Sequence, residues 1–87
     1  MAEPTSTAQT IADLRARRGA AIKARREAAD LSQRALAMRA GITNSTVADI
    51  EKGLQSVSDQ TLVRLADALG CEVHELFAYE PVTQEAS

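Results

Sequence analysis

Aromatic residues are almost missing from this chain, which has one Tyr, one Phe and no Trp among its 87 residues. Aromatic and β-branched residues are enriched in strands, whereas alanine and leucine, which dominate the apolar residues here, favour closely packed helices. The composition therefore predicts an all-α fold. A chain of this length has room for one domain with a small core, to whose stability a partner subunit could add.

Residues that support catalysis, disulfides or metal binding are also scarce. Cys71 is the only cysteine and His74 the only histidine, and no nucleophile belongs to a recognisable catalytic set. We expect His74 to lie on the surface and Cys71 to pack as a small apolar residue, with a redox sensor as the weaker alternative. The chain is therefore expected to be no enzyme and to need no metal, cofactor or small-molecule ligand.

Long apolar runs are missing as well. No segment approaches the length of a membrane-spanning helix, and the N-terminal segment lacks the apolar core of a signal peptide. These absences predict a cytosolic protein.

Charge is unevenly distributed although the net charge is only −2. Residues 1–45 contain eight Lys and Arg against four Asp and Glu, whereas residues 46–87 contain two against eight. Six of the ten basic residues lie within twelve positions: Arg15, Arg17, Arg18, Lys23, Arg25 and Arg26. Such a density indicates either a positive surface or an ordinary solvated helix face.

Helix starts follow one local pattern that occurs three times. An apolar residue precedes Ser or Thr, and another apolar residue lies four positions after that hydroxyl: Leu31, Ser32, Leu36; Ile42, Thr43, Val47; and Val57, Ser58, Leu62. The hydroxyl can cap a free N–H group while the apolar pair fixes the angle at which the chain enters the helix. Three helix starts are therefore predicted.

Glycines mark the helix ends. Gly41, Gly53 and Gly70 stand where a left-handed residue would terminate each helix. The predicted helices cover residues 33–40, 44–52 and 59–69, with a short last helix over 73–77.

The N-terminal segment has a less regular pattern. Apolar residues follow helical spacing from Ile11 to Ile22, but Gly19 interrupts it. We predict a helix over residues 18–29 and interpret residues 8–17 as either its extension or a mobile basic arm. The last four of the five predicted helices have apolar residues at three- and four-residue spacings, which we assign to one core: Leu36, Ala37, Ala40, Val47, Ile50, Leu62, Leu65, Ala66, Leu69, Val73, Leu76 and Phe77.

The short break at Gly41 decides how the helix that begins at Asn44 is presented. Two helices joined by a short turn containing glycine cross steeply, so the second helix projects from the body. Its first turn offers free N–H groups, a positive dipole end and the short polar side chains of Asn44, Ser45 and Thr46. Such a helix can enter a groove of DNA.

Several pieces of this sequence resemble the Cro and phage-repressor family of helix-turn-helix proteins, often called XRE-type. The resemblance lies in "IKARREAADLSQRALAMRAGITNSTVADIEKG" and "TLVRLADALGCEVHELF", from Ile22 to Phe77. It implies a five-helix, lambda-repressor-like DNA-binding domain over residues 18–78, preceded by a flexible or partly helical basic arm (1–17) and followed by an irregular acidic tail (79–87). It also implies a regulator encoded by a bacterium or phage and associated with the nucleoid.

The resemblance implies roles for individual residues. Gln33 would contact a phosphate and brace the recognition helix, and Asn44 would read adenine or act as a first-turn cap. Ser45 and Thr46 would reach bases or phosphates, with local capping as the alternative for Thr46. The complete set expected at DNA is Gln33, Arg34, Arg39, Thr43, Asn44, Ser45, Thr46, Ala48, Asp49 and Lys52. Arg26 and Glu51 match positions that form a structural ion pair in the family.

Some positions depart from the family pattern. Asp49 stands where Arg or another DNA-facing polar residue is common, and its carboxylate would repel phosphates unless it accepts from a cytosine amino group. Ala48 offers only a methyl group. Arg34 replaces a frequent Glu and Arg39 adds charge on the same helix, so phosphate attraction is expected to rest on that helix and the arm. Lys52 would contact a phosphate or remain solvated.

Three functions are consistent with this sequence. The first is a sequence-specific repressor or regulator that binds an inverted repeat of double-stranded DNA as a homodimer. The second is an antitoxin whose acidic C-terminal region holds a toxin. The third is a protein-interaction module with weak DNA binding, which Asp49 would suit. The dimer surface is expected to use residues that nothing obviously covers in a monomer: Leu76, Phe77, Tyr79 and Val82.

Overall fold

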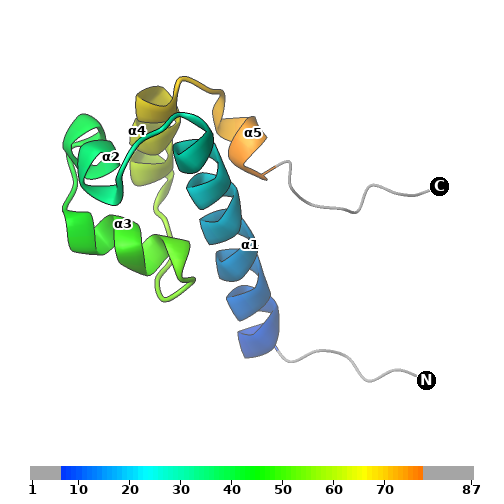
Figure 1. Cartoon of the computed structure of the whole chain (residues 1–87). Helices are drawn as coiled ribbons and strands as arrows, with labels where there is room; N and C mark the ends of the chain where they lie inside the picture. Colours follow the sequence, from blue (N-terminus) through cyan, green and yellow to red (C-terminus); the bar gives the residue numbers. More distant parts are fainter. Residues whose placement is uncertain (1–6, 78–87) are drawn as a thin grey trace.

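The computed structural model describes residues 7–77, which form five α-helices (Figure 1). The helices are α1 (Thr7–Ala28), α2 (Gln33–Ala40), α3 (Asn44–Glu51), α4 (Asp59–Leu69) and α5 (Val73–Phe77). The described residues contain no strand, so the all-α prediction is confirmed. Within the same residues no helix is both long and apolar enough to cross a membrane.

Serine and threonine hydroxyls begin three of these helices. The side chains of Ser32, Thr43 and Ser58 each accept a hydrogen bond from the backbone N–H group three residues later in the chain. The distances are 3.0, 3.1 and 3.1 Å. Each of the three caps has extended backbone angles, as a residue that precedes a helix should. The starts of α2, α3 and α4 are therefore the predicted ones.

Left-handed residues follow the same helices. Gly41 and Gly70 cap α2 and α4 with φ angles of 73° and 72°. Gly53 has a φ of 76°, but α3 ends one residue before the predicted bound, with Lys52 as its C-cap. Helix α1 ends before Asp30, a residue whose φ of 61° gives it the role that glycine has elsewhere.

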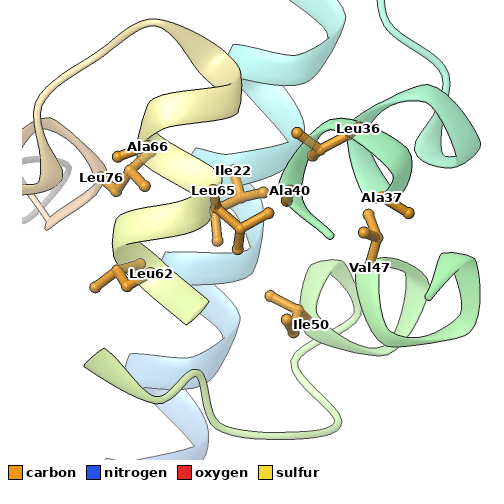
Figure 2. Close-up of a cluster of buried hydrophobic side chains, with 10 residues drawn as sticks. All are labelled: Ile22, Leu36, Ala37, Ala40, Val47, Ile50, Leu62, Leu65, Ala66 and Leu76. Atoms are coloured by element: carbon orange, nitrogen blue, oxygen red, sulfur yellow. The ribbon is translucent and has the colours of Figure 1, made fainter. Parts of the chain in front are cut away.

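One apolar cluster holds the helices together (Figure 2). All five helices contribute to its ten buried residues, which are Ile22, Leu36, Ala37, Ala40, Val47, Ile50, Leu62, Leu65, Ala66 and Leu76. Leu69 and Val73 pack against it while partly exposed. The core is therefore close to the predicted one.

Leu76 corrects the expected dimer surface. Its side chain is only 1% exposed and lies in the core, near Ala66 in Figure 2. Helix α5 turns this face toward α1 and α4, so the expectation that Leu76 lies uncovered is wrong, whereas its assignment to the core from helical spacing is confirmed. The side chain of Phe77, and all of Tyr79 and Val82, lie outside the described residues.

Helix α1 is longer than the predicted segment of residues 18–29. It runs without interruption from Thr7 to Ala28, so residues 8–17 belong to it, and its N-terminal end points away from the other helices (Figure 1). Arg15 fixes part of this extension, because its Nε donates to Ser56 Oγ at 3.0 Å in the segment between α3 and α4.

Gly19 explains why the helical pattern is interrupted without the helix ending. It is buried where α1 crosses the C-terminal end of α3. A Cβ added there would clash with the carbonyl oxygen of Ile50 and lie 2.8 Å from that of Glu51. Glycine is therefore needed for close packing of the two helices, and not to break α1.

Candidate nucleic-acid interface

Helix α3 lies at the edge of the molecule with its N-terminal end away from α1 (Figure 1). Val47 and Ile50 are 1% and 2% exposed and point from α3 into the core (Figure 2). Ser45, Asp49 and Lys52, spaced by four and three residues, lie on the opposite side of the helix. Helix α3 therefore has a buried face that fixes it and an outer face that is available to a ligand.

The first turn of α3 contains free and locally bonded polar groups side by side. Thr43 is the cap, and its hydroxyl oxygen also lies 2.8 Å from that of Thr46. Thr46 is half-buried, and its hydroxyl takes part in local capping through this contact with Thr43. Asn44 and Ser45 are exposed, and neither side chain has a hydrogen bond within the described residues. Their two side chains, together with unpaired first-turn N–H groups, can meet an external partner.

Glu51 anchors the other end of α3. Arg26 of α1 donates from Nε to Glu51 Oε2 at 2.7 Å and from Nη2 to Oε1 at 3.1 Å. The two side chains are 11% and 3% exposed. Arg26 also donates from Nη1 to the carbonyl oxygen of Leu31 at 2.7 Å. The ion pair expected from the family resemblance is present, and it joins α1 to α3.

Gln33 is part of the same network. Its Nε2 donates to Glu51 Oε1 at 3.0 Å, which connects the first residue of α2 to the last residue of α3. The hydrogen bonds from Arg26 to Glu51 raise the pKa of the guanidinium above its ordinary value, while partial burial acts in the opposite direction. A permanently charged Arg26 and the amide of Gln33 thus hold Glu51 from two helices.

Basic side chains expected at DNA are exposed on both helices of the motif. Arg34 and Arg39 are exposed on α2, and Lys52 is exposed at the C-terminal end of α3. Ala48 and Asp49 are half-buried on α3. No salt bridge joins Asp49 to another group in the described part of the chain.

The six clustered basic residues of α1 do not form one free positive surface. Arg15 is bonded to Ser56, Arg26 to Glu51, and Arg25 to Glu75 Oε1 of α5 at 2.7 Å. Two further members, Arg17 and Arg18, also have interactions. Much of this charge is therefore used to hold α1 against the rest of the domain, a use that linear spacing does not distinguish from an exposed patch.

Two contacts at this site are not indicated by local sequence patterns alone. The bond between Gln33 and Glu51 joins residues that are eighteen positions apart, and only the family resemblance implies that Gln33 braces the recognition helix. The close approach at Gly19 did leave a signal, because a single glycine inside a helical pattern marks either a break or a tight helix crossing. Of the two alternatives left open for residues 8–17, the structure has the extension of the helix.

A family model described as Helix-turn-helix matches residues 22–76 of this chain. The chain belongs to the XRE-type helix-turn-helix family. Within that family it resembles two uncharacterised HTH-type transcriptional regulators from two strains of Mycobacterium tuberculosis, each 36% identical over 59 residues. The match covers 68% of this chain but 42% of each relative, so the chain spans less than half the length of these regulators.

Solved structures of helix-turn-helix regulators have the same arrangement. The restriction-modification controller protein C.AhdI from Aeromonas hydrophila is 39% identical with a TM-score of 0.73, and the match covers 76% of this chain and 98% of that protein. The clp gene regulator ClgR from Corynebacterium glutamicum is 27% identical with a TM-score of 0.74. That match covers 76% of this chain and 70% of ClgR.

Proposed function

We propose that this helix-turn-helix chain is a sequence-specific regulator of transcription, acting as a repressor, that binds double-stranded DNA as a homodimer on an inverted repeat. Helix α3 enters the major groove with Asn44 and Ser45 leading. The observation that carries the proposal is the first turn of α3, where the exposed side chains of Asn44 and Ser45 have no hydrogen bond within the described residues while the opposite face of the helix is buried.

The shape and charge of this end suit the major groove. A helix fits that groove, which is about 12 Å wide, and its N-terminal N–H groups and dipole attract phosphate oxygens. Small side chains at Asn44 and Ser45 allow the helix end to approach base edges closely. The amide of Asn44 can pair with adenine in bidentate fashion, which supplies a direct means of reading sequence.

Phosphate contacts would surround this base-reading end. Arg34 and Arg39 of α2 and Lys52 after α3 are exposed and positively charged at neutral pH. The N-terminal N–H groups of α2 at Gln33, and the second Nε2 proton of its side chain, can also reach a phosphate. Such contacts fix the register of the protein on DNA and supply affinity that does not depend on sequence.

The short length of α3 supports the proposal of a homodimer. The eight residues of α3 extend about 12 Å, which is enough to contact only a few base pairs. Two copies related by a two-fold axis double the number of bases read and require an inverted repeat whose half-sites lie about 34 Å apart. Occupying such a site at a promoter would block transcription, which is why we propose a repressor.

A protein-interaction module is the second candidate, because Asp49 places on the outer face of α3 a carboxylate that has no salt-bridge partner within residues 7–77. Selection of bound fragments from genomic DNA by the full chain separates the two candidates. The repressor proposal expects an enriched inverted repeat with half-site centres one helical turn apart. Failure to retard any duplex at low salt, even at high protein concentration, would instead support the interaction module.

A further inference from the structure

Asp49 is a half-buried residue on the outer side of α3, the side that is available to a ligand. It lies four residues after Ser45 and three before Lys52, on the side opposite Val47 and Ile50. These two apolar side chains are almost completely buried, so the helix cannot rotate to turn Asp49 away. The ion pair of Glu51 with Arg26 further fixes this orientation.

The carboxylate of Asp49 is electrostatically unfavourable at a surface that contacts DNA. Within the described residues no Lys, Arg or His forms a salt bridge with it, although Lys52 is only three positions away. Next to the phosphates of a duplex an unpaired carboxylate is repelled. A favourable contact therefore requires a hydrogen-bond donor on the DNA.

The major groove offers such donors on only two bases. Guanine presents N7 and O6 and thymine presents O4, all of which are acceptors that repel a carboxylate. Adenine presents the N6 amino donor, but its N7 acceptor lies directly beside it. Cytosine presents the N4 amino donor without a neighbouring acceptor on the same base, which makes it the best partner for Asp49.

We propose that Asp49 selects a cytosine in each half-site by accepting a hydrogen bond from its N4 amino group. This inference rests on the proposed function and specifies one base of the site. Asn44 and Asp49 are five residues apart, which is about 7.5 Å along a helix, or about two base-pair steps at 3.4 Å each. The cytosine is therefore expected about two base pairs from the adenine that Asn44 reads.

Selection from a randomised duplex library tests this assignment with the full chain and three variants. The variants are Asp49→Ala, Asp49→Asn and the control Asp67→Ala, which removes an exposed carboxylate from α4 and changes the net charge equally. Wild type and Asp67→Ala should enrich the same cytosine. Asp49→Ala should lose preference at that position alone, with discrimination against other bases falling about tenfold or more. Asp49→Asn should shift the preference toward adenine.

The outcomes separate failure of this inference from failure of the proposed function. If the wild-type chain enriches no inverted repeat, the proposed function and this inference are both overturned. If it enriches one but Asp49→Ala selects the same bases, binding every sequence uniformly more tightly, Asp49 acts only by repelling phosphates and this inference alone is overturned. Thermal unfolding of each variant shows whether it is folded in the binding assay.

Discussion

Glu51→Gln tests how strongly the network behind the recognition helix stabilises the fold. The substitution keeps the shape of the side chain but removes the charge that accepts two hydrogen bonds from Arg26 and one from Gln33. Breaking a buried ion pair costs about 3–5 kcal/mol. Arg26 is 11% exposed and keeps its bond to the Leu31 carbonyl oxygen, so we expect about 3 kcal/mol, the lower end of that range.

This loss is large for a domain of this size. Small domains have free energies of unfolding near the lower end of about 5–15 kcal/mol, so Glu51→Gln should remove roughly half of the stability. At about 4–8 °C per kcal/mol the midpoint of thermal unfolding should fall by about 12 °C or more. Urea denaturation followed by far-UV circular dichroism measures the free energy directly.

A matched control is available in the ion pair of Arg25, the residue that precedes Arg26 in α1. Glu75→Gln breaks the ion pair with Arg25, whose two side chains are 33% and 42% exposed, and should cost less than about 1 kcal/mol. A double-mutant cycle of Arg26→Met and Glu51→Gln should give a coupling energy of about 2 kcal/mol or more between the two side chains. If Glu51→Gln is no more destabilising than Glu75→Gln, the network around Glu51 behaves as a solvated ion pair and does not stabilise the fold as expected.

Three further outcomes are expected. Gly19→Ala should lower the free energy of unfolding by about 1–3 kcal/mol through its clash with Ile50, although alanine favours helices. If urea denaturation shows instead that this free energy has increased, α1 and α3 can move apart without cost. In retardation assays Asn44→Ala should weaken preferred sites far more than random DNA, whereas Arg39→Ala should weaken both similarly and lower the salt slope by about 1; equal losses for Asn44→Ala would remove it from base reading. Burial raises the pKa of the Cys71 thiol, so iodoacetamide should alkylate it at pH 8 more slowly in the folded chain than in urea, and equal rates would contradict its burial.

The helices of this protein could be predicted because their signals are local. Ser32, Thr43 and Ser58 cap helices within three residues of themselves, and Gly41 and Gly70 end helices within one turn. Each of these interactions needs only the chain nearby. The spacing of apolar residues then indicates which side of each helix is buried.

Tertiary contacts limited the prediction elsewhere. Gly19 is explained by the carbonyl groups of α3, and Leu76 is covered because α5 packs back on α1 and α4. Arg25 was counted toward a positive surface although Glu75, fifty positions later, binds it. For Gly19 and Arg25 the deciding partner lies far away in sequence, where periodicity carries no information, whereas the spacing of Leu76 also placed it in the core.

The candidate site was predictable to a similar extent. The exposed polar end of α3 follows from the turn at Gly41 and the apolar residues behind it. What Asn44 and Asp49 bind does not follow, because it depends on how the helix lies against a particular duplex. That orientation is set by contacts of the whole domain, including phosphate contacts from α2.

Cross-linking from the outer face of α3 tests most directly whether this helix enters the major groove of DNA. Ser45→Cys, in a chain that also carries Cys71→Ala, can be labelled with a short photoreactive group and bound to the selected duplex. A label at Asp67→Cys on α4 provides the comparison. We expect cross-links from position 45 to bases in the major groove of each half-site and none from position 67. Cross-links from position 67, with none from position 45, would contradict it.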